Sequence, residues 1–322
     1  MRSAPKRRIA TALTTASDEF RDALLSGLRS IPKSIPCKYF YDAEGSRLFE
    51  QICDLPEYYP TRTELSLLRA HSAEIAALAG PNVEIMEFGA GAGEKIRIIL
   101  DALESPRAYI PMDISDSSLG PAAERLASAY PGVAIHPVTG DFASELRWPF
   151  SSPARRIGFF PGSTIGNFTP PEAREFLSAT ARLLRGGALL IGVDLVKEPA
   201  ILHAAYNDSA GVTAAFNRNL LARANRELGA NFDVMSFSHY AFYNPVEQRI
   251  EMHLVSDVRQ FATVSGRSIH FAEGETLITE YSYKYNVEQF QELAASAGFV
   301  PRALWCDSDR LFSMHWLEAA GN

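Results

Sequence analysis

The chain contains 322 residues, of which 47% are hydrophobic and 21% are charged. That composition supplies enough apolar surface for a buried core, so it excludes a chain that is disordered throughout. The 31 Lys and Arg residues and the 38 Asp and Glu residues give a formal net charge of −7, which argues against a protein that coats nucleic acid. The length accommodates one large domain or two of ordinary size.

Cysteine and histidine residues show no spacing typical of a cross-linked or metal-binding protein. The three cysteines, Cys37, Cys53 and Cys306, are scattered and form no CxxC pair, so we expect no disulfide framework, no structural zinc and a reducing compartment. The seven histidines show no metal-ligand spacing such as HxxxH, and we predict no metal site.

No stretch of the sequence predicts a membrane span or a signal peptide. The longest apolar stretch, residues 188–196, is interrupted by Gly192 and Asp194 and is far too short to cross a bilayer. Residues 1–20 are basic but lack the apolar core of a signal peptide, so we expect a frayed N-terminus. We therefore expect a cytoplasmic, monomeric protein with no membrane or nucleic-acid partner.

From residue 83 onward, strand-like and helix-like segments alternate. The strand-like runs are rich in Val, Ile and aromatic residues and mostly end in Gly or Asp; they cover residues 83–89, 109–114, 133–141, 156–163 and 188–195. Helical patterns lie between them, at residues 94–103, 117–130 and 170–187. Strands that alternate with helices predict right-handed βαβ units and therefore a parallel sheet.

The alternation stops after residue 195. A helix is predicted at residues 211–228, and three segments with alternating polar and apolar residues indicate an antiparallel sheet, at residues 237–244, 249–256 and 276–285. A helix at 287–298 and a hairpin of residues 302–307 and 311–318 complete the chain. A reversed last strand is typical of S-adenosylmethionine (SAM) methyltransferases, whereas nicotinamide-binding sheets usually end on another parallel unit. The order of elements therefore favours an α/β, Rossmann-like class I SAM methyltransferase sheet.

A glycine-rich loop, EFGAGAGEK at residues 87–95, follows the first predicted strand and opens a helix. Gly89, Gly91 and Gly93 let the backbone turn sharply and approach a ligand. A dinucleotide fingerprint places its third glycine one residue later, so the loop fits SAM better than a nicotinamide dinucleotide. By itself the loop is also compatible with an ordinary tight turn.

Residues at the next two strand ends strengthen the cofactor hypothesis. Asp113 ends the second strand, where a carboxylate can accept both ribose hydroxyls. Asp141 and Phe142 end the third strand and suit an amide-type contact and an apolar wall for adenine. Because these residues and the loop occur in order at three successive strand ends, we predict a nucleoside cofactor.

Five longer segments resemble one specific family. Residues 32–64, 161–170, 194–228, 249–254 and 277–285 are similar to the bacterial L-histidine Nα-methyltransferase of ergothioneine biosynthesis. The resemblance implies that three SAM molecules methylate the α-amino group of L-histidine to give hercynine, the first step of ergothioneine biosynthesis. It also implies a second, α+β domain built from residues 1–60 and the insertion 196–285. The SAM-binding domain would then comprise residues 61–195, completed by 286–322.

The matching motifs carry the family's site residues over to this chain. Tyr58, Asn167 and Tyr206 would hold the backbone of histidine and are the candidate catalytic residues, and Glu280 and Ser282 would hold the imidazole. Phe49, Thr213, Phe216 and Met252 match further substrate positions. Tyr41, Gly89, Lys95, Asp113, Asp141, Phe142 and Gly162 match cofactor positions. The loop GAGAGEK is poorer in Ser and Thr than the family's, and MDIS lacks a second acid after Asp113.

The expected chemistry makes sense of these residue types. Methyl transfer from a sulfonium is an in-line displacement, so the enzyme chiefly aligns the reactants. An unperturbed phenol, with a pKa of about 10, is poorly matched to the role of a base near neutral pH, so we assign positioning to Tyr58 and Tyr206 first and proton transfer only second. Glu280 and Ser282 lie two residues apart on a predicted strand and therefore point to the same face, where they can bind both imidazole nitrogens.

Simpler interpretations exist for the individual residues. Met252 can be a core residue, Asn167 a turn residue and Glu280 a solvated charge. The competing functions are a SAM-dependent N-methyltransferase of another α-amino acid or small amine, a NAD-linked dehydrogenase, and a non-catalytic amino acid sensor. The irregular glycine loop argues against the dehydrogenase, and the intact cofactor positions argue against the sensor. The pair Glu280 and Ser282 favours histidine over other amines.

Overall fold

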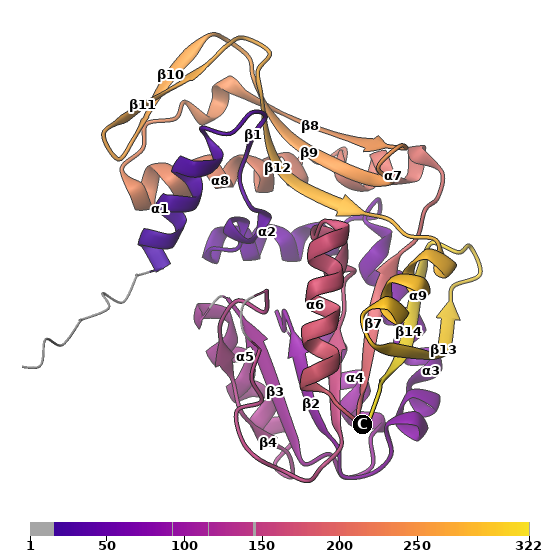
Figure 1. Cartoon of the computed structure of the whole chain (residues 1–322). Helices are drawn as coiled ribbons and strands as arrows, with labels where there is room; N and C mark the ends of the chain where they lie inside the picture. The colour runs from indigo at the N-terminus through magenta and orange to yellow at the C-terminus, as the bar shows by residue number, and fades with distance from the viewer. Residues whose placement is uncertain (1–15, 92, 115, 144–145, 322) are drawn as a thin grey trace, which may run out of the picture.

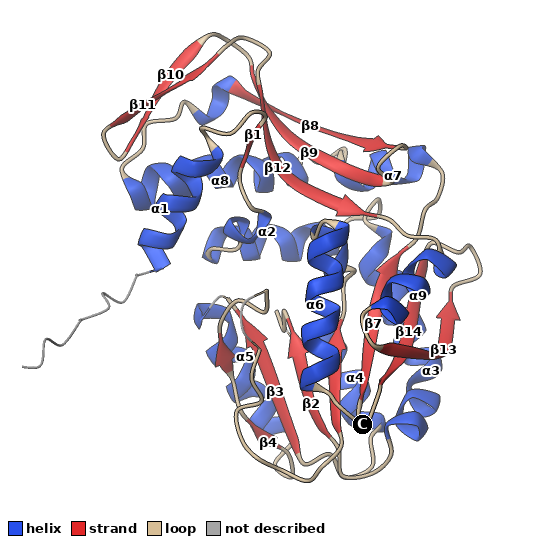
Figure 2. Cartoon of the chain, viewed as in Figure 1, coloured by secondary structure: helices blue, strands red, loops and turns tan. Residues whose placement is uncertain are grey.

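The computed structural model describes residues 16–91, 93–114, 116–143 and 146–321, so the basic N-terminal start lies outside the described residues. A large β-sheet and a smaller one stand one above the other in Figure 1. Helices cover both faces of the large sheet, and a further group of helices packs under the smaller sheet, as the colouring of Figure 2 shows.

The large sheet is the predicted α/β sheet with a reversed strand. Its strands are β2 (Glu84–Phe88), β3 (Ala108–Asp113), β4 (Ala134–Ile135), β5 (Val138–Thr139), β6 (Arg156–Phe160), β7 (Ala188–Asp194), β13 (Phe299–Cys306) and β14 (Phe312–Ala319). They lie in the order β13-β14-β7-β6-β2-β3-β4, and β5 also pairs with β3. The pairs from β7 to β4 are parallel, whereas β14 runs antiparallel to both β7 and β13. The predicted reversed strand is therefore confirmed.

The third predicted strand, residues 133–141, is not continuous. It forms two short pieces, β4 and β5, on either side of His136 and Pro137. Proline has no N–H to donate to a ladder, so pairing is interrupted at that point and the strand is confined to the edge of the sheet. The prediction of one strand over these residues was wrong for this reason.

Helices sandwich the large sheet. α3 (Tyr59–Ala79), α4 (Glu94–Ala102) and α5 (Asp116–Ala129) pack on one face, and α6 (Pro170–Leu183) and α9 (Val287–Ser296) on the other. α6 starts with a capping box formed by Thr169 and Glu172 and carries proline in its first turn. The proline-marked start that the sequence predicts for this helix is confirmed.

The smaller sheet contains the antiparallel strands predicted after residue 195. Its order is β1 (Lys33–Ser34), β12 (Thr276–Tyr283), β9 (Arg249–Ser256) and β8 (Phe237–Asn244). The helices packed with it are α1 (Ala16–Gly27), α2 (Ala43–Cys53), α7 (Pro199–Tyr206) and α8 (Val212–Leu228). Since β1 runs parallel to β12, the N-terminal segment and the insertion share one sheet and one core.

A hairpin that the sequence analysis did not predict extends from the smaller sheet. It consists of β10 (Gln260–Val264) and β11 (Arg267–Phe271), visible at the upper left of Figure 1. Ser265 and Gly266 connect the strands, and both have positive φ, at 48° and 76°. Two residues with positive φ form the tight turn that suits twisted strands. The Ser-Gly pair between alternating segments was the available signal.

The insertion leaves and rejoins the large sheet at one place. Leu195, just after β7, forms a parallel bridge with Tyr285, just after β12. The N–H of Tyr285 donates to the carbonyl of Asp194 at 3.1 Å, and the N–H of Val196 donates to the carbonyl of Tyr285 at 3.1 Å. We call residues 194–197 and 282–285 the seam. The seam holds the C-terminal ends of β7 and β12 side by side.

A buried carboxylate ties α3 to the loops above the large sheet. Glu64 is fully buried, and its oxygens accept from the N–H of Gly162 at 2.9 and 3.0 Å and from Nζ of Lys95 at 2.6 Å. Lys95 lies in the first turn of α4, directly after the glycine-rich loop, and Gly162 follows β6. Because a buried carboxylate must be paired, Glu64 fixes these two loops relative to each other.

Gly192→Ala should lower the free energy of unfolding by about 1–3 kcal/mol, the usual cost of overpacking a core. A Cβ on Gly192 would clash with Oε1 of Glu64 and lie 2.9 Å from the ring of Phe312, so the carboxylate would be pushed out of place. Urea unfolding measures the change. The control is Gly132→Ala, at an exposed glycine where an added Cβ meets nothing within 4 Å, and it should leave the midpoint nearly unchanged. An unchanged midpoint for Gly192→Ala would contradict this account of the Glu64 contact.

Candidate active site

A cavity lies between the two sheets, next to the seam. It encloses about 610 Å³ of space, part of which opens to solvent. All the predicted substrate residues line it: Phe49, Tyr58, Asn167, Tyr206, Thr213, Phe216, Met252, Glu280 and Ser282. Tyr41 and Gly162, from the predicted cofactor set, line it as well. The cavity therefore joins predicted residues from distant parts of the chain, from Tyr41 in the N-terminal segment to Ser282 on β12.

Aromatic side chains form one side of the cavity. We call Tyr41, Phe49, Tyr58, Tyr206 and Phe216 the aromatic wall. The ring of Phe49 lies 5.6 Å from that of Tyr41, 6.3 Å from that of Tyr58 and 6.1 Å from that of Phe216, and the rings of Tyr58 and Tyr206 lie 6.4 Å apart. Aromatic faces at such spacing can surround a cationic group.

Glu280 and Ser282 project from β12 into the cavity, on the same side of the strand, as the sequence analysis predicts. The pairing of β12 with β9 shifts register between Ile278 and Glu280, which marks a β-bulge. Thr279 anchors the bulge, because its hydroxyl donates to Oδ1 of Asn217 at 2.7 Å and contacts the carbonyl of Met252 at 3.1 Å. The bulge leaves Glu280 opposite Met252, which also lines the cavity.

The carboxylate of Glu280 faces the cavity and is half-buried. Among the described residues, no protein group donates a hydrogen bond to it. Burial raises the pKa of Glu280 to about 7, although the positive charge of Lys284 lowers it. Above that pH, Glu280 is thus a charged acceptor available to a ligand N–H.

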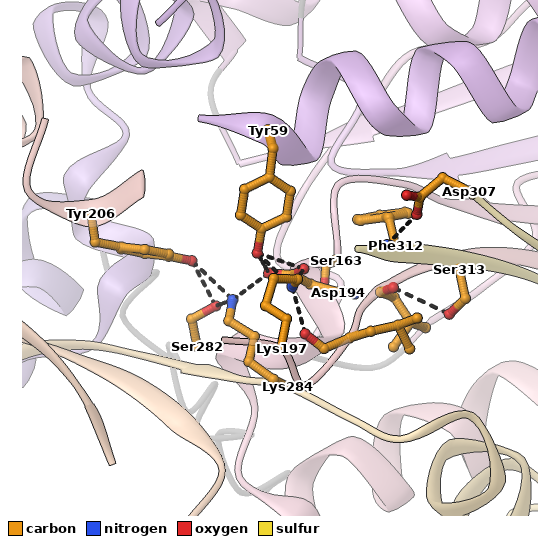
Figure 3. Close-up of polar contacts among 12 residues, drawn as sticks. Tyr59, Ser163, Asp194, Lys197, Tyr206, Ser282, Lys284, Asp307, Phe312 and Ser313 are labelled. Atoms are coloured by element: carbon orange, nitrogen blue, oxygen red, sulfur yellow. Dashed lines mark hydrogen bonds and ion pairs between the residues drawn. The ribbon is translucent and has the colours of Figure 1, made fainter. Parts of the chain in front are cut away.

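A lysine lies behind Ser282 and Tyr206, as Figure 3 shows. Nζ of Lys284 is 2.8 Å from Oγ of Ser282, 3.2 Å from the hydroxyl of Tyr206 and 2.7 Å from Oδ2 of Asp194. The two hydroxyls are 2.9 Å apart. Burial and the charge of Lys284 act in opposite directions on the pKa of Tyr206, and burial prevails, so that pKa is raised.

Asp194 is the centre of this polar cluster (Figure 3). Besides Lys284, it accepts from Nζ of Lys197 at 2.5 Å and from the hydroxyl of Tyr59 at 2.8 Å. Burial raises the pKa of Asp194, but the two lysines outweigh it and lower that pKa below its usual value. Burial lowers the pKa of Lys197 to about 8, whereas Asp194 and Tyr206 raise the pKa of Lys284 against the effect of burial. Of the two lysines, Lys284 therefore keeps its charge to the higher pH.

The glycine-rich loop and Asp113 lie together. The N–H of Gly91 donates to Oδ2 of Asp113 at 3.2 Å, and the N–H of Gly89 donates to the carbonyl of Met112 at 2.8 Å. Gly89, Gly91 and Gly93 have φ of 75°, 49° and 75°, a region that favours glycine. An added Cβ at Gly91 would meet nothing within 4 Å, so the backbone there is accessible to a ligand.

The other predicted cofactor residues adjoin this loop but do not line the cavity. An added Cβ at Gly89 would lie 3.6 Å from the ring of Phe142. Oδ2 of Asp141 pairs with Nζ of Lys38 at 2.7 Å, which links the N-terminal segment to this side of the sheet. Lys95 is engaged by Glu64 and lies beside Gly162, where an added Cβ would be 3.5 Å from Nζ. Gly162 therefore connects the cofactor side to the cavity.

The simpler interpretations of three residues can now be compared with their positions. Met252 is buried in the core of the smaller sheet and also lines the cavity, so the core and pocket interpretations both apply to it. Asn167 ends the short 3-10 helix η2 (Thr164–Asn167) and also lines the cavity. Glu280 is not on a solvated face. Tyr59, the neighbour of Tyr58, is a core residue whose hydroxyl reaches Asp194.

Lys284 and Asp194 line the cavity, and the sequence analysis missed both. Lys284 follows Glu280 and Ser282 at two-residue steps in the segment 276–285 that the sequence predicts as a strand, so the same period-two argument would have found it. Asp194 ends β7 as Asp113 ends β3, and strand ends are where sites in such sheets occur. No sequence signal indicated that the two side chains would meet.

Within the described ranges, no helix has the length and apolar character needed to cross a membrane. Over the same residues, no three His, Cys, Asp or Glu side chains are grouped so that they could bind a metal ion. Cys37, Cys53 and Cys306 are free thiols.

Comparison with known proteins identifies the family. Residues 20–319 match the family described as "Histidine-specific methyltransferase, SAM-dependent". The Histidine N-alpha-methyltransferase of Mycolicibacterium smegmatis is 46% identical over 302 residues, covering 92% of this chain and 94% of that protein. The protein of the same name from Mycobacterium tuberculosis is 45% identical, covering 89% and 91%. Ergothioneine biosynthesis protein 1 of Neurospora crassa is 28% identical over 85% of this chain and 32% of its own length. The chain therefore belongs to the family of SAM-dependent, histidine-specific methyltransferases.

Proposed function

We propose that the chain transfers three methyl groups from SAM to the α-amino nitrogen of L-histidine and so produces hercynine, the first step of ergothioneine biosynthesis. One observation carries the proposal: the residues matched to the amino acid site come from widely separated segments, yet line a single cavity. Gly162 and Tyr41, both from the proposed cofactor set, line the same cavity, which supports a methyl donor bound beside it. Substrate and methyl donor would thus meet in one hollow.

The ends of the parallel strands fit a SAM molecule. The open backbone at Gly91 allows close approach, and Asp113 beside it offers a carboxylate to ribose hydroxyls. Asp141 and Phe142 would contact adenine, and Gly89, Lys95, Gly162 and Tyr41 complete the proposed cofactor set. When bound, SAM supplies an electrophilic methyl group on its sulfonium.

The contribution of the protein to the transfer is alignment. The attacking amine must be neutral, and Asn167 and the hydroxyls of Tyr58 and Tyr206 would orient its lone pair. Burial raises the pKa of Tyr58 well above its ordinary value, and that of Tyr206 is raised as well, so both phenols are poor bases. The proton would leave through water rather than through either tyrosine.

The aromatic wall explains how one site accommodates three rounds. Each round makes the nitrogen larger and less able to donate hydrogen bonds, and the last leaves a permanent cation. The faces of Phe49, Tyr58 and Phe216 attract such a cation through their electron-rich rings. The reaction then stops by itself, because a trimethylated nitrogen has no lone pair.

Histidine is favoured over other amino acids by the polar pair on β12. Glu280 can accept from one imidazole nitrogen and Ser282 can bind the other. A site with such groups rejects ligands that leave them unpaired more strongly than an apolar pocket does. The alternative function, N-methylation of another α-amino acid or a small amine, would leave Glu280 or Ser282 without a partner wherever the ligand lacks an N–H and a bare nitrogen at the two positions.

Further features are proposed on the resemblance. We assign residues 61–195 and 286–322 to the SAM-binding domain and residues 1–60 and 196–285 to an α+β substrate domain. We also propose that the protein acts as a cytoplasmic monomer without nucleic-acid, membrane or metal partners.

The direct experiment is incubation of the protein with SAM and L-histidine, followed by mass spectrometry. The proposal requires a product heavier by three methyl groups than histidine. Other amino acids and histamine are screened in parallel. If one of them is methylated in preference to histidine, that compound is the substrate and the proposal for histidine fails. Failure to bind SAM would support the sensor instead.

Glu280→Ala should weaken histidine binding by about ten- to a hundredfold, since a hydrogen bond to a charged group contributes roughly 1.5–3 kcal/mol. The same change should relax selectivity toward bulkier aromatic amino acids, because alanine leaves more room in the cavity and removes the carboxylate that requires a ligand N–H. Calorimetric titration with histidine and with tryptophan measures both effects. Glu288→Ala, an exposed glutamate on α9, is the control and should bind like the wild type. Unchanged histidine affinity in Glu280→Ala would remove Glu280 from its role.

The kcat/KM for histidine should fall toward acid pH for two reasons. The substrate's ammonium cannot attack, and Glu280, whose pKa burial raises to about 7, is ionised above that pH and protonated below it. A protonated Glu280 no longer accepts from the imidazole as a carboxylate, so activity is lost as pH falls through 7. Glu280→Gln should remove the contribution of the enzyme carboxylate and keep the dependence on the substrate's own imidazole, with a pKa of about 6.5, and on its amine. Initial rates against pH, for both proteins, test this; a flat wild-type profile across the amine's titration would contradict the neutral-amine mechanism.

A further inference from the structure

We infer that Lys284 is a positioning residue that makes Ser282 a hydrogen-bond donor toward the ligand and thereby selects amino acids whose ring offers an unprotonated nitrogen. The inference rests on the proposed function, because it concerns how the same cavity recognises the side chain of its amino acid. It assigns Lys284 no direct contact with the substrate.

Three hydrogen-bond partners surround Nζ of Lys284. An ammonium group has three donors and no acceptor. Asp194, Ser282 and Tyr206 occupy three positions around Nζ, at 2.7, 2.8 and 3.2 Å. Each hydroxyl therefore accepts from Lys284, and neither can direct its own proton toward the lysine.

The hydroxyls of Ser282 and Tyr206 have two protons between them to donate. Ser282 and Tyr206 each have one proton, and the 2.9 Å contact between them uses one of the two. Both residues line the cavity. One hydroxyl proton is thus left for a ligand. With Tyr206 donating to Ser282, the remaining proton is that of Ser282, on the same strand face as Glu280.

A ligand in the cavity therefore meets one acceptor and one donor side by side on β12. Glu280, two residues away, is an acceptor with no donor from the described residues, and Ser282 is a donor. A neutral imidazole has one N–H and one bare nitrogen, so it satisfies both in a single orientation of its tautomer. A ring with an N–H but no second nitrogen would satisfy Glu280 and leave the proton of Ser282 unpaired.

Asp194 makes this arrangement durable. It pairs with Lys284 on one side and with Lys197 and Tyr59 on the other, all in the interior. Lys284 therefore stays charged and fixed, and its donors stay aimed at the two hydroxyls. Without that charge, Ser282 could turn its proton toward Tyr206 and accept from a ligand as readily as donate to it.

A double-mutant cycle over Lys284→Met and Ser282→Ala tests the inference. Binding of histidine and of the two isomers of pyrrolylalanine, which keep one ring N–H and lack the second nitrogen, is measured by calorimetry with saturating S-adenosylhomocysteine. In the wild type, histidine should bind at least about tenfold more tightly than either isomer, as expected for one hydrogen bond with a charge-fixed donor. Lys284→Met should lower the ratio of histidine to pyrrolylalanine affinity to about threefold or less. In a protein that already carries Ser282→Ala, adding Lys284→Met should change that ratio little.

The matched control is Lys197→Met, which removes the other lysine from Asp194 but touches neither hydroxyl. It should leave the ratio of histidine to pyrrolylalanine at the wild-type value. Lys284→Met retains partners for Asp194 in Lys197 and Tyr59; if it nevertheless fails to fold, Lys284→Gln takes its place in the cycle. Melting temperature and S-adenosylhomocysteine affinity confirm that each variant is intact.

The inference would be overturned if Lys284→Met lowered the ratio of histidine to pyrrolylalanine affinity by the same factor whether Ser282 or Ala occupies position 282. Lys284 would then not act through Ser282. An unchanged ratio in Lys284→Met, or an equal loss in Lys197→Met, would overturn it as well. Failure of the proposed function is recognised separately: the wild type would bind histidine with the expected selectivity but form no trimethylated product.

Discussion

The ion pair between Asp194 and Lys284 holds together the two sides of the cavity. Asp194 ends β7 in the large sheet, and Lys284 directly follows β12 in the smaller one, so the pair joins the sheets at the seam. Both residues are almost completely buried, and buried charges are costly unless they are paired and hydrogen-bonded. The backbone bonds of Tyr285 and Val196 run beside the pair. The position of β12, and with it of Glu280 and Ser282, depends on this junction.

The charges around the seam also give the cavity two chemically different ends. At the polar end, two lysines share the carboxylate of Asp194, and Glu280 contributes a second carboxylate when it is ionised. The aromatic wall, which has no charge of its own, begins at Tyr206 beside Lys284 and continues through Tyr58 to Phe49. An amino acid has a carboxylate, an amine that becomes a methylated cation, and a side chain to be recognised. Under the proposed function, the cavity would offer a different environment to each of these groups, which a purely apolar pocket could not do.

The sequence predicts most of the large sheet because its strands are long and apolar and its turns are marked by Gly, Asp and Pro. It fails where a local feature overrides the pattern: Pro137 divides the third strand, and the Ser265–Gly266 turn forms an additional hairpin. The cavity residues followed from the resemblance, and the spacing of Glu280 and Ser282 independently placed them on one face. The contact between Asp194 and Lys284 could not be predicted, since neither local propensity nor spacing indicates that residues 90 positions apart will meet.

The place of the insertion explains why these contacts can serve methyl transfer. In open α/β sheets, ligands bind beyond the carboxyl ends of the strands, and the insertion departs from such an end, at Asp194. Its return strand, β12, borders the cavity and rejoins this same edge of the sheet at the bridge between Leu195 and Tyr285. A second tie, from Lys38 to Asp141, fixes the N-terminal segment to the same edge. Alignment of an amine with a methyl group tolerates little displacement, and here it is determined by short links to one sheet edge rather than by a flexible connection between independent bodies.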